Sequence, residues 1–220
     1  MNLSNNKIDS IKGFENLKEL LYLNLYNNSI IVIENLLQLC KLEILILSQN
    51  KIVKLNEISN FNLKMLNLTS NQITKVKGLE KLKNLEEIYL TSNRIKEIDG
   101  FQNLRNLKIL KIDFNYLTDV DFLAFSNCNF EDLDLRNNWI KNIKNVVVLK
   151  QIKQINLKFN QITDIEEIKE IINFSEIDFI NVEGNPFLEN TGLKLYGFGY
   201  ENHLEDLRKY FRSQGQKFNL

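Results

Sequence analysis

Cysteine, histidine and proline are scarce in this chain of 220 residues, which contains two cysteines, one histidine and one proline. Cys40 and Cys128 each stand ten residues before an asparagine of the repeat described below, and four repeats separate them. Stacked strands would place them roughly 19 Å apart, which is too far for a disulfide. Two reduced thiols are typical of an intracellular protein.

Long apolar runs and an excess of charge are also missing. No run approaches the roughly 18 apolar residues of a membrane span, and the start, MNLSNNKI, has no apolar signal region. We therefore expect no membrane segment and a location in the cytoplasm or nucleus. The 28 basic residues are balanced by 28 acidic ones, so no basic excess favours direct binding of nucleic acid.

The sequence contains few candidate catalytic residues. The only histidine, His203, lies in a segment with helical spacing and has no cysteine or paired carboxylate at ligand spacing, so we expect it on the surface. The GFG sequence at 197–199 lacks the preceding strand and the full GxGxxG of a phosphate loop. No set of nucleophile, base and orienting residue can be assembled, and we expect no enzyme activity, no metal and no cofactor.

What the chain does contain is a repeat of about 22 residues, LxxLxxLxLxxNxI, which is complete between Asn71 and Asn93. Its asparagine recurs in steps of 21 to 25 residues, at Asn6, Asn28, Asn50, Asn71, Asn93, Asn115, Asn138, Asn160 and Asn185. This period and leucine spacing resemble those of leucine-rich repeats. The resemblance implies an α/β solenoid, a curved horseshoe with a parallel sheet on its concave side and short helical turns on its convex side.

Each repeat position has a physical role. Residues five and three before the asparagine are aliphatic and alternate at period two, which predicts a strand with those side chains inward. Residues five and eight after it, such as Val120 and Leu123, are also apolar, and their spacing of three suits a tight 3₁₀-like return. The asparagine carries donors and an acceptor for buried turn amides, so we expect a structural ladder of Asn28, Asn50, Asn71, Asn93, Asn115, Asn138, Asn160 and Asn185.

The repeats predict one elongated domain over residues 1–190, with about nine repeats. Met1 and Leu3 already occupy strand positions, so we expect no N-terminal cap. Pro186 offers no amide to continue the pattern. Residues 191–220 are expected to form a loop and a capping helix, since Leu204, Leu207 and Phe211 recur at helical spacing.

Residues six, four and two before each asparagine are expected to point outward and form the concave face. Aromatic residues are enriched at interface hot spots, which favours binding of a protein there over a structural spacer. We expect Asp134 to point to solvent. The candidate partner-binding residues are Tyr22, Tyr26, Ile44, Ile46, Met65, Tyr89, Lys111, Asp132, Asp134 and Arg136.

A second candidate surface is the rim that follows the strands. Tyr116 and Trp139 come directly after the asparagine of adjacent repeats, where most other repeats have Lys, Arg, Ser or Gln. We expect both to lie on the rim and to contact a partner. Phe114 and Phe159 directly precede the asparagine, and either a rim position or a core position fits them.

The longer pattern LxxLxLxxNxIxxIxxLxxL resembles one 22-residue subclass, typified by the nuclear regulatory subunit of type-1 protein phosphatase. The match is clearest in GLEKLKNLEEIYLTSNRIKEIDGFQNL, residues 78–104. The resemblance implies a concave face that grips a phosphatase catalytic subunit, with Asp134 at a matching acidic position. The subclass also includes a light chain of axonemal dynein and a spliceosomal protein. A ciliary or cytoskeletal scaffold and an assembly subunit of a ribonucleoprotein are therefore the alternatives.

Overall fold

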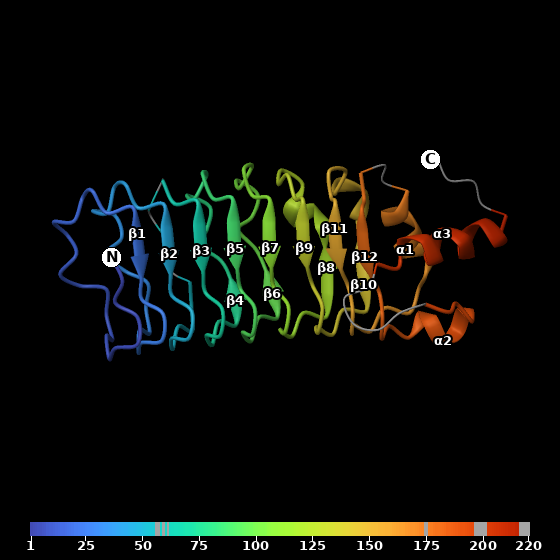
Figure 1. Cartoon of the computed structure of the whole chain (residues 1–220), viewed down its shortest axis with the longest axis horizontal. Helices are drawn as coiled ribbons and strands as arrows, with labels where there is room; N and C mark the ends of the chain where they lie inside the picture. Colours follow the sequence, from blue (N-terminus) through green and yellow to red (C-terminus); the bar gives the residue numbers. More distant parts are fainter. Residues whose placement is uncertain (56–57, 59, 61, 174–175, 196–201, 216–220) are drawn as a thin grey trace.

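The main feature of the computed structural model, which describes residues 1–55, 58, 60, 62–173, 176–195 and 202–215, is one parallel sheet. Neighbouring strands of this sheet come from successive repeats, so the chain winds as a solenoid from one end of the molecule to the other (Figure 1). The predicted fold class is confirmed. The strands in order are β1 (Tyr22–Asn24), β2 (Ile44–Ile46), β3 (Met65–Asn67), β5 (Glu87–Tyr89), β7 (Ile109–Lys111), β9 (Asp132–Asp134), β11 (Gln154–Asn156) and β12 (Phe179–Asn181).

The register of the sheet aligns equivalent repeat positions. Leu45 at the centre of β2 lies opposite Leu23 and Leu66 of the neighbouring strands. Every central strand residue is fully buried, which builds a continuous aliphatic column inside the solenoid. Burial of each such side chain contributes about 1.5–3 kcal/mol. One repeat cannot cover its own apolar side chains, so this energy arises only when the units stack.

In part of the solenoid, the units also form a second short strand after the ladder asparagine. Two short parallel pairs form there, β4 (Lys75–Val76) with β6 (Glu97–Ile98) and β8 (Asp119–Asp121) with β10 (Asn142–Lys144). The 3₁₀ geometry therefore begins later in the unit than we predicted. It appears as single turns, such as the bonds from the Leu82 amide to the Leu79 carbonyl, and as η1 (Phe122–Phe125) and η2 (Val146–Val148). The convex side also carries α1 (Glu166–Ile172).

The unit between Asn115 and Asn138 departs from the predicted inward positions. Leu123 was expected in the core but is 51% exposed, whereas Phe122 and Phe125 are fully buried. The 23-residue step adds one residue, and η1 uses it to turn the phenylalanines inward. The Phe125 ring packs edge-on against Phe101 at a centroid distance of 5.2 Å, so aromatic volume fills the wider turn.

Two helices follow the last strand, α2 (Phe187–Thr191) and α3 (Leu204–Ser213). Helix α3 contacts β12 and α1 at the C-terminal end of the sheet (Figure 1), and it buries Leu204, Leu207 and Phe211 there. The expectation for His203 is wrong, because it is buried. Its amide donates to the Ile180 carbonyl at 2.8 Å and its Nδ1 accepts from the Val182 amide at 3.3 Å. The GFG sequence at 197–199 lies outside the described residues.

Candidate protein-binding surfaces

The ladder asparagines hold the turns that carry both candidate surfaces. Asn93 shows the arrangement: its Nδ2 donates to the carbonyls of Leu90 and Leu68, each at 3.0 Å, and its Oδ1 accepts from the Ile73 amide at 3.0 Å. Each asparagine thus joins its own loop to the preceding one. The same bonds recur at Asn28, Asn50, Asn71, Asn115, Asn138, Asn160 and Asn185, all of them buried.

Asn6, at the first position, differs from the others. It is exposed, and its Nδ2 donates only to the Leu3 and Ser4 carbonyls of its own loop. The ladder role therefore depends on a preceding unit and on exclusion of water.

The first half of the concave face is an apolar stripe. The sheet register places Tyr22, Ile44 and Met65 in one row across β1, β2 and β3. Ile46 lies in the next row, which continues through Asn67 of β3 to Tyr89 of β5. Tyr22 is exposed, and the others, together with Tyr26 beyond the end of β1, are half-buried. Tyr22, Ile44, Ile46 and Met65 are neighbours in the sheet, and Tyr89 lies one strand beyond Met65, next to Asn67.

Tyr89 marks the end of this stripe and is fixed in place. Its hydroxyl donates to Glu87 Oε2 at 2.7 Å. Burial, followed by this hydrogen bond, raises the pKa of Tyr89 to about 12. The hydroxyl therefore stays protonated at neutral pH, and the ring is held in one orientation before any partner arrives.

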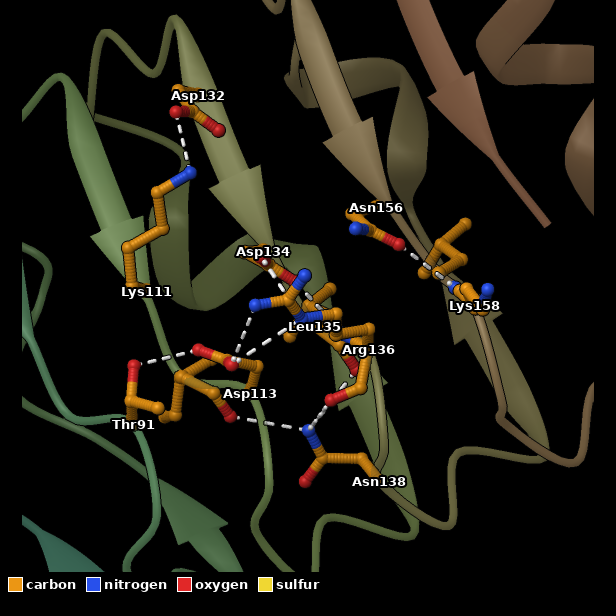
Figure 2. A network of polar contacts seen from close by, with 12 residues as sticks. Thr91, Lys111, Asp113, Asp132, Asp134, Leu135, Arg136, Asn138, Asn156 and Lys158 are labelled. Atoms are coloured by element: carbon orange, nitrogen blue, oxygen red, sulfur yellow. Dashed lines mark hydrogen bonds and ion pairs between the residues drawn. The ribbon is translucent and has the colours of Figure 1, made fainter. Parts of the chain in front are cut away.

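The second half of the concave face holds a polar pocket of about 470 Å³ (Figure 2). Its charged side chains are paired across neighbouring strands. Lys111 Nζ lies 2.5 Å from Asp132 Oδ2, and Arg136 Nη2 lies 3.3 Å from Asp113 Oδ2. The lining residues are Thr91, Lys111, Asp113, Asp132, Asp134, Arg136, Gln154, Asn156 and Phe179.

The expectation that Asp134 points to solvent is wrong, because this residue is only 6% exposed. Its Oδ1 accepts from the Arg136 amide at 3.1 Å, and its Oδ2 lies 3.5 Å from Arg136 Nε. Burial, together with the neighbouring Asp113 carboxylate, raises the pKa of Asp134 to about 6, although Arg136 acts in the opposite direction. Asp113 is buried as well and accepts from Thr91 Oγ1 at 2.6 Å. Partners therefore meet Lys111, Asp132 and Arg136 before Asp134.

The rim carries four exposed aromatic side chains. The core position that we considered for Phe114 and Phe159 is wrong, since these residues are 49% and 46% exposed. Tyr116 and Trp139 are exposed too, and their rings meet edge to face with centroids 5.8 Å apart. Cations of the concave face reach the two phenylalanines: the Arg136 guanidinium lies 5.8 Å from the Phe114 ring centre, and Lys158 Nζ lies 4.6 Å from that of Phe159.

The backbone beneath these phenylalanines is left-handed. The residue before each ladder asparagine has a positive φ, which is 54° at both Phe114 and Phe159. Asparagine and glycine tolerate this region, but other side chains pay about 1–2 kcal/mol for it. At most other repeats this position is Asn, Ser or Gly. Phe114 and Phe159 therefore occupy a backbone conformation that disfavours bulky side chains. Because the same repeat position is Asn, Ser or Gly in most other units, the sequence alone could have indicated that these two rings are unusual.

Among the described residues, no group of three His, Cys, Asp or Glu could hold a metal ion. Burial raises the pKa of the Cys128 thiol to about 12, which keeps it protonated and unreactive. Cys40 and Cys128 are both free thiols. No helix within the described ranges is long and apolar enough to cross a membrane.

Comparison with known proteins identifies the repeat. The family described as Leucine Rich repeats (2 copies) matches residues 61–101 and 84–125. Internalin C2 from Listeria monocytogenes, known from a crystal structure, is 30% identical in sequence to this chain. The match covers 82% of this chain and 78% of the internalin C2 chain, with a TM-score of 0.69. An internalin (inlF) of the same organism is 28% identical with a TM-score of 0.71, and this chain spans about half of it, 52%.

A leucine-rich-repeat protein of Leptospira interrogans shares the fold, with a TM-score of 0.63 at 24% identity over 84% of this chain and 55% of its own. No curated protein matches. Leucine-rich-repeat proteins are generally protein-interaction modules, and the matches indicate no catalytic family. The repeat, the parallel sheet and the 30% sequence identity to internalin C2 show that this chain belongs to the leucine-rich-repeat family.

Proposed function

We propose that this chain is a non-enzymatic module that binds a partner protein on its concave face. One observation carries the proposal: the apolar stripe on β1 to β5 continues directly into the charged pocket on β7 to β11. A contiguous apolar surface beside fixed polar groups is the usual composition of a binding surface. A structural spacer has no need of either.

The apolar stripe supplies binding energy. Tyr22, Ile44 and Met65 lie in register, so one partner surface can cover all three. Tyr89 is already held by Glu87, and its ring loses little conformational freedom on binding. We propose Tyr22, Tyr26 and Tyr89 as the apolar anchors.

The charged pocket sets the orientation of the partner. Asp113, Asp132 and Asp134 face two cations, Lys111 and Arg136, so three carboxylates against two cations leave one negative charge when all are ionised. A basic or hydrogen-bond-donating side chain of the partner complements this pocket. The ion pairs hold the acceptors in position beforehand, which favours orientation and association rate.

The first partner to test is the catalytic subunit of a type-1 protein phosphatase. The resemblance of residues 78–104 to the phosphatase-regulator subclass supports this choice. We also propose an intracellular setting, supported by the two free thiols. A dynein or cytoskeletal complex and a spliceosomal complex are the other outcomes of the same capture experiment.

The test captures partners on the immobilised chain and then measures the affinity of the recovered protein, beginning with purified phosphatase catalytic subunit. Tyr89→Ala should weaken binding by about 2 kcal/mol, near 30-fold, if Tyr89 is an anchor. The matched control is Lys83→Glu with Arg105→Glu, which changes two exposed side chains of the convex turns. Loss of binding in that control, with full binding by Tyr89→Ala, would place the site on the convex side and overturn the proposal.

A further inference from the structure

A second surface lies on the rim and is separate from the concave face. It is a hollow of about 440 Å³ lined by Lys96, Tyr116, Thr118 and Trp139, which we call the rim hollow. Backbone hydrogen bonds fix the units that form it, from the Tyr116 amide to the Ile95 carbonyl at 2.9 Å and from the Trp139 amide to the Leu117 carbonyl at 2.8 Å. Both aromatic rings therefore sit on rigid, stacked backbone.

The rings of the rim hollow are exceptions in their column of repeat positions. The equivalent residues of the other units are polar except Pro186, namely Lys7, Ser29, Lys51, Gln72, Arg94 and Gln161. The fold therefore does not require an aromatic residue there. Tyr116 and Trp139 stand in adjacent units, and their edge-to-face contact at an interplanar angle of 81° frames the hollow between them. Two neighbouring exposed rings that enclose a hollow differ from isolated apolar residues on a surface.

The charge around the rim hollow is positive. Arg94, Lys96 and Lys141 are exposed in the same two columns of repeat positions. Within the described part of the chain, Arg94 and Lys96 form no ion pair, in contrast to the paired cations of the concave pocket. Two carboxylates adjoin the lining residues in sequence and are engaged elsewhere. Glu97 pairs with Lys75, and Asp119 accepts a hydrogen bond from Asn142 and lines a different hollow.

We propose that the rim hollow binds an acidic segment of a partner protein. One apolar side chain of that segment enters between Tyr116 and Trp139, and flanking carboxylates pair with Arg94 and Lys96. Two observations favour a peptide over single-stranded nucleic acid. The rings stand at 81° to each other, so successive bases cannot stack in parallel on both. The chain also has no basic excess to release counterions, with 28 residues of each sign.

The test is a selection from a random-peptide display library on the full chain. A variant with Tyr116→Gln and Trp139→Gln serves for counter-selection, because glutamine stands at this position in two other units and the fold should be unaffected. Enriched peptides should carry Asp or Glu on both sides of one apolar residue. Enrichment of basic or neutral peptides, or equal enrichment on the counter-selection variant, would overturn the proposal.

Affinity can then be followed through Trp139, which is the only tryptophan of the chain. A synthetic copy of the enriched peptide should shift its emission, and Arg94→Glu with Lys96→Glu should weaken binding at least tenfold. Lys7→Glu with Lys51→Glu reverses two charges at the repeat position of Arg94 in earlier units and should have no effect. A shift with oligothymidylate but not with the peptide would assign the hollow to nucleic acid instead. Tyr89→Ala should leave peptide binding intact, so this test and that of the concave face can fail separately.

Discussion

Replacement of Asn93 by alanine tests the asparagine ladder in the middle of the solenoid. Asn93 is 6% exposed and bonds four backbone groups: the carbonyls of Leu68, Leu90 and, at 3.3 Å, Thr91, and the amide of Ile73. The Leu68 and Leu90 carbonyls do not lose every donor in the variant. Leu68 still accepts from Asn71, and Leu90 still accepts from Asn115.

The Ile73 amide has no such substitute, because its acceptor is the Asn93 side chain. An unsatisfied buried amide costs about 1–3 kcal/mol, and we expect Asn93→Ala to lower the free energy of unfolding by this amount. Asn93→Asp should cost more. A carboxylate can still accept from Ile73, but it cannot donate, and it faces the carbonyl oxygens of Leu68 and Leu90 with a buried charge.

The matched control is Asn6→Ala, which removes the same side chain from an exposed position with bonds only to its own loop. It should change the free energy of unfolding by less than about 0.5 kcal/mol, as ordinary surface substitutions do. Urea denaturation followed by Trp139 emission and by circular dichroism provides the measurement. Equal effects of Asn93→Ala and Asn6→Ala would show that the ladder bonds contribute no more in the interior than in water.

Two other substitutions test the rim and the pocket. Phe114→Asn places a residue that tolerates a left-handed backbone at φ 54° and should raise the free energy of unfolding by about 1 kcal/mol in urea denaturation; a lower value would mean that the exposed ring stabilises the fold. Because burial raises the pKa of Asp134 to about 6, above the usual value for aspartate, the folded state holds this proton more tightly. The stability of the parent chain should therefore fall, relative to Asp134→Asn, as the pH rises from about 4 to about 6. Parallel pH profiles of the two proteins, measured by thermal unfolding, would rule this out.

The solenoid was predictable because the physics of the fold is periodic. A strand in which Leu23 and Leu25 both face inward requires only an apolar residue at every second position. The 22-residue step repeats this pattern along the chain. The exception is the unit with Phe122 and Leu123. One added residue shifts which side chains of the turn face inward, and counting from the asparagine cannot locate the shift. The cluster of phenylalanines in that unit was the available signal.

Burial of polar side chains depended on neighbours in adjacent units. The alternation correctly faces Asp134 away from the core, but Arg136 and Asp113 enclose it on the concave face. Asp113 and Arg136 stand two residues before consecutive ladder asparagines, so their pairing across the sheet could be read from the sequence. The burial of Asp134 could not, because it depends on the conformation of the long Arg136 side chain.

Arg136 spans the edge between the concave pocket and Phe114 on the rim. Its guanidinium pairs with Asp113 and Asp134 inside the concave pocket (Figure 2) and lies 5.8 Å from the centre of the Phe114 ring on the rim. A concave partner that engages these carboxylates changes the charge environment beside that ring. Substitution of Arg136 therefore disturbs Phe114 as well as the concave pocket, and it is not a clean test of the pocket. Tyr89, which bonds Glu87, and Trp139, which contacts Tyr116, each belong to one surface alone, and variants at these two positions separate the surfaces.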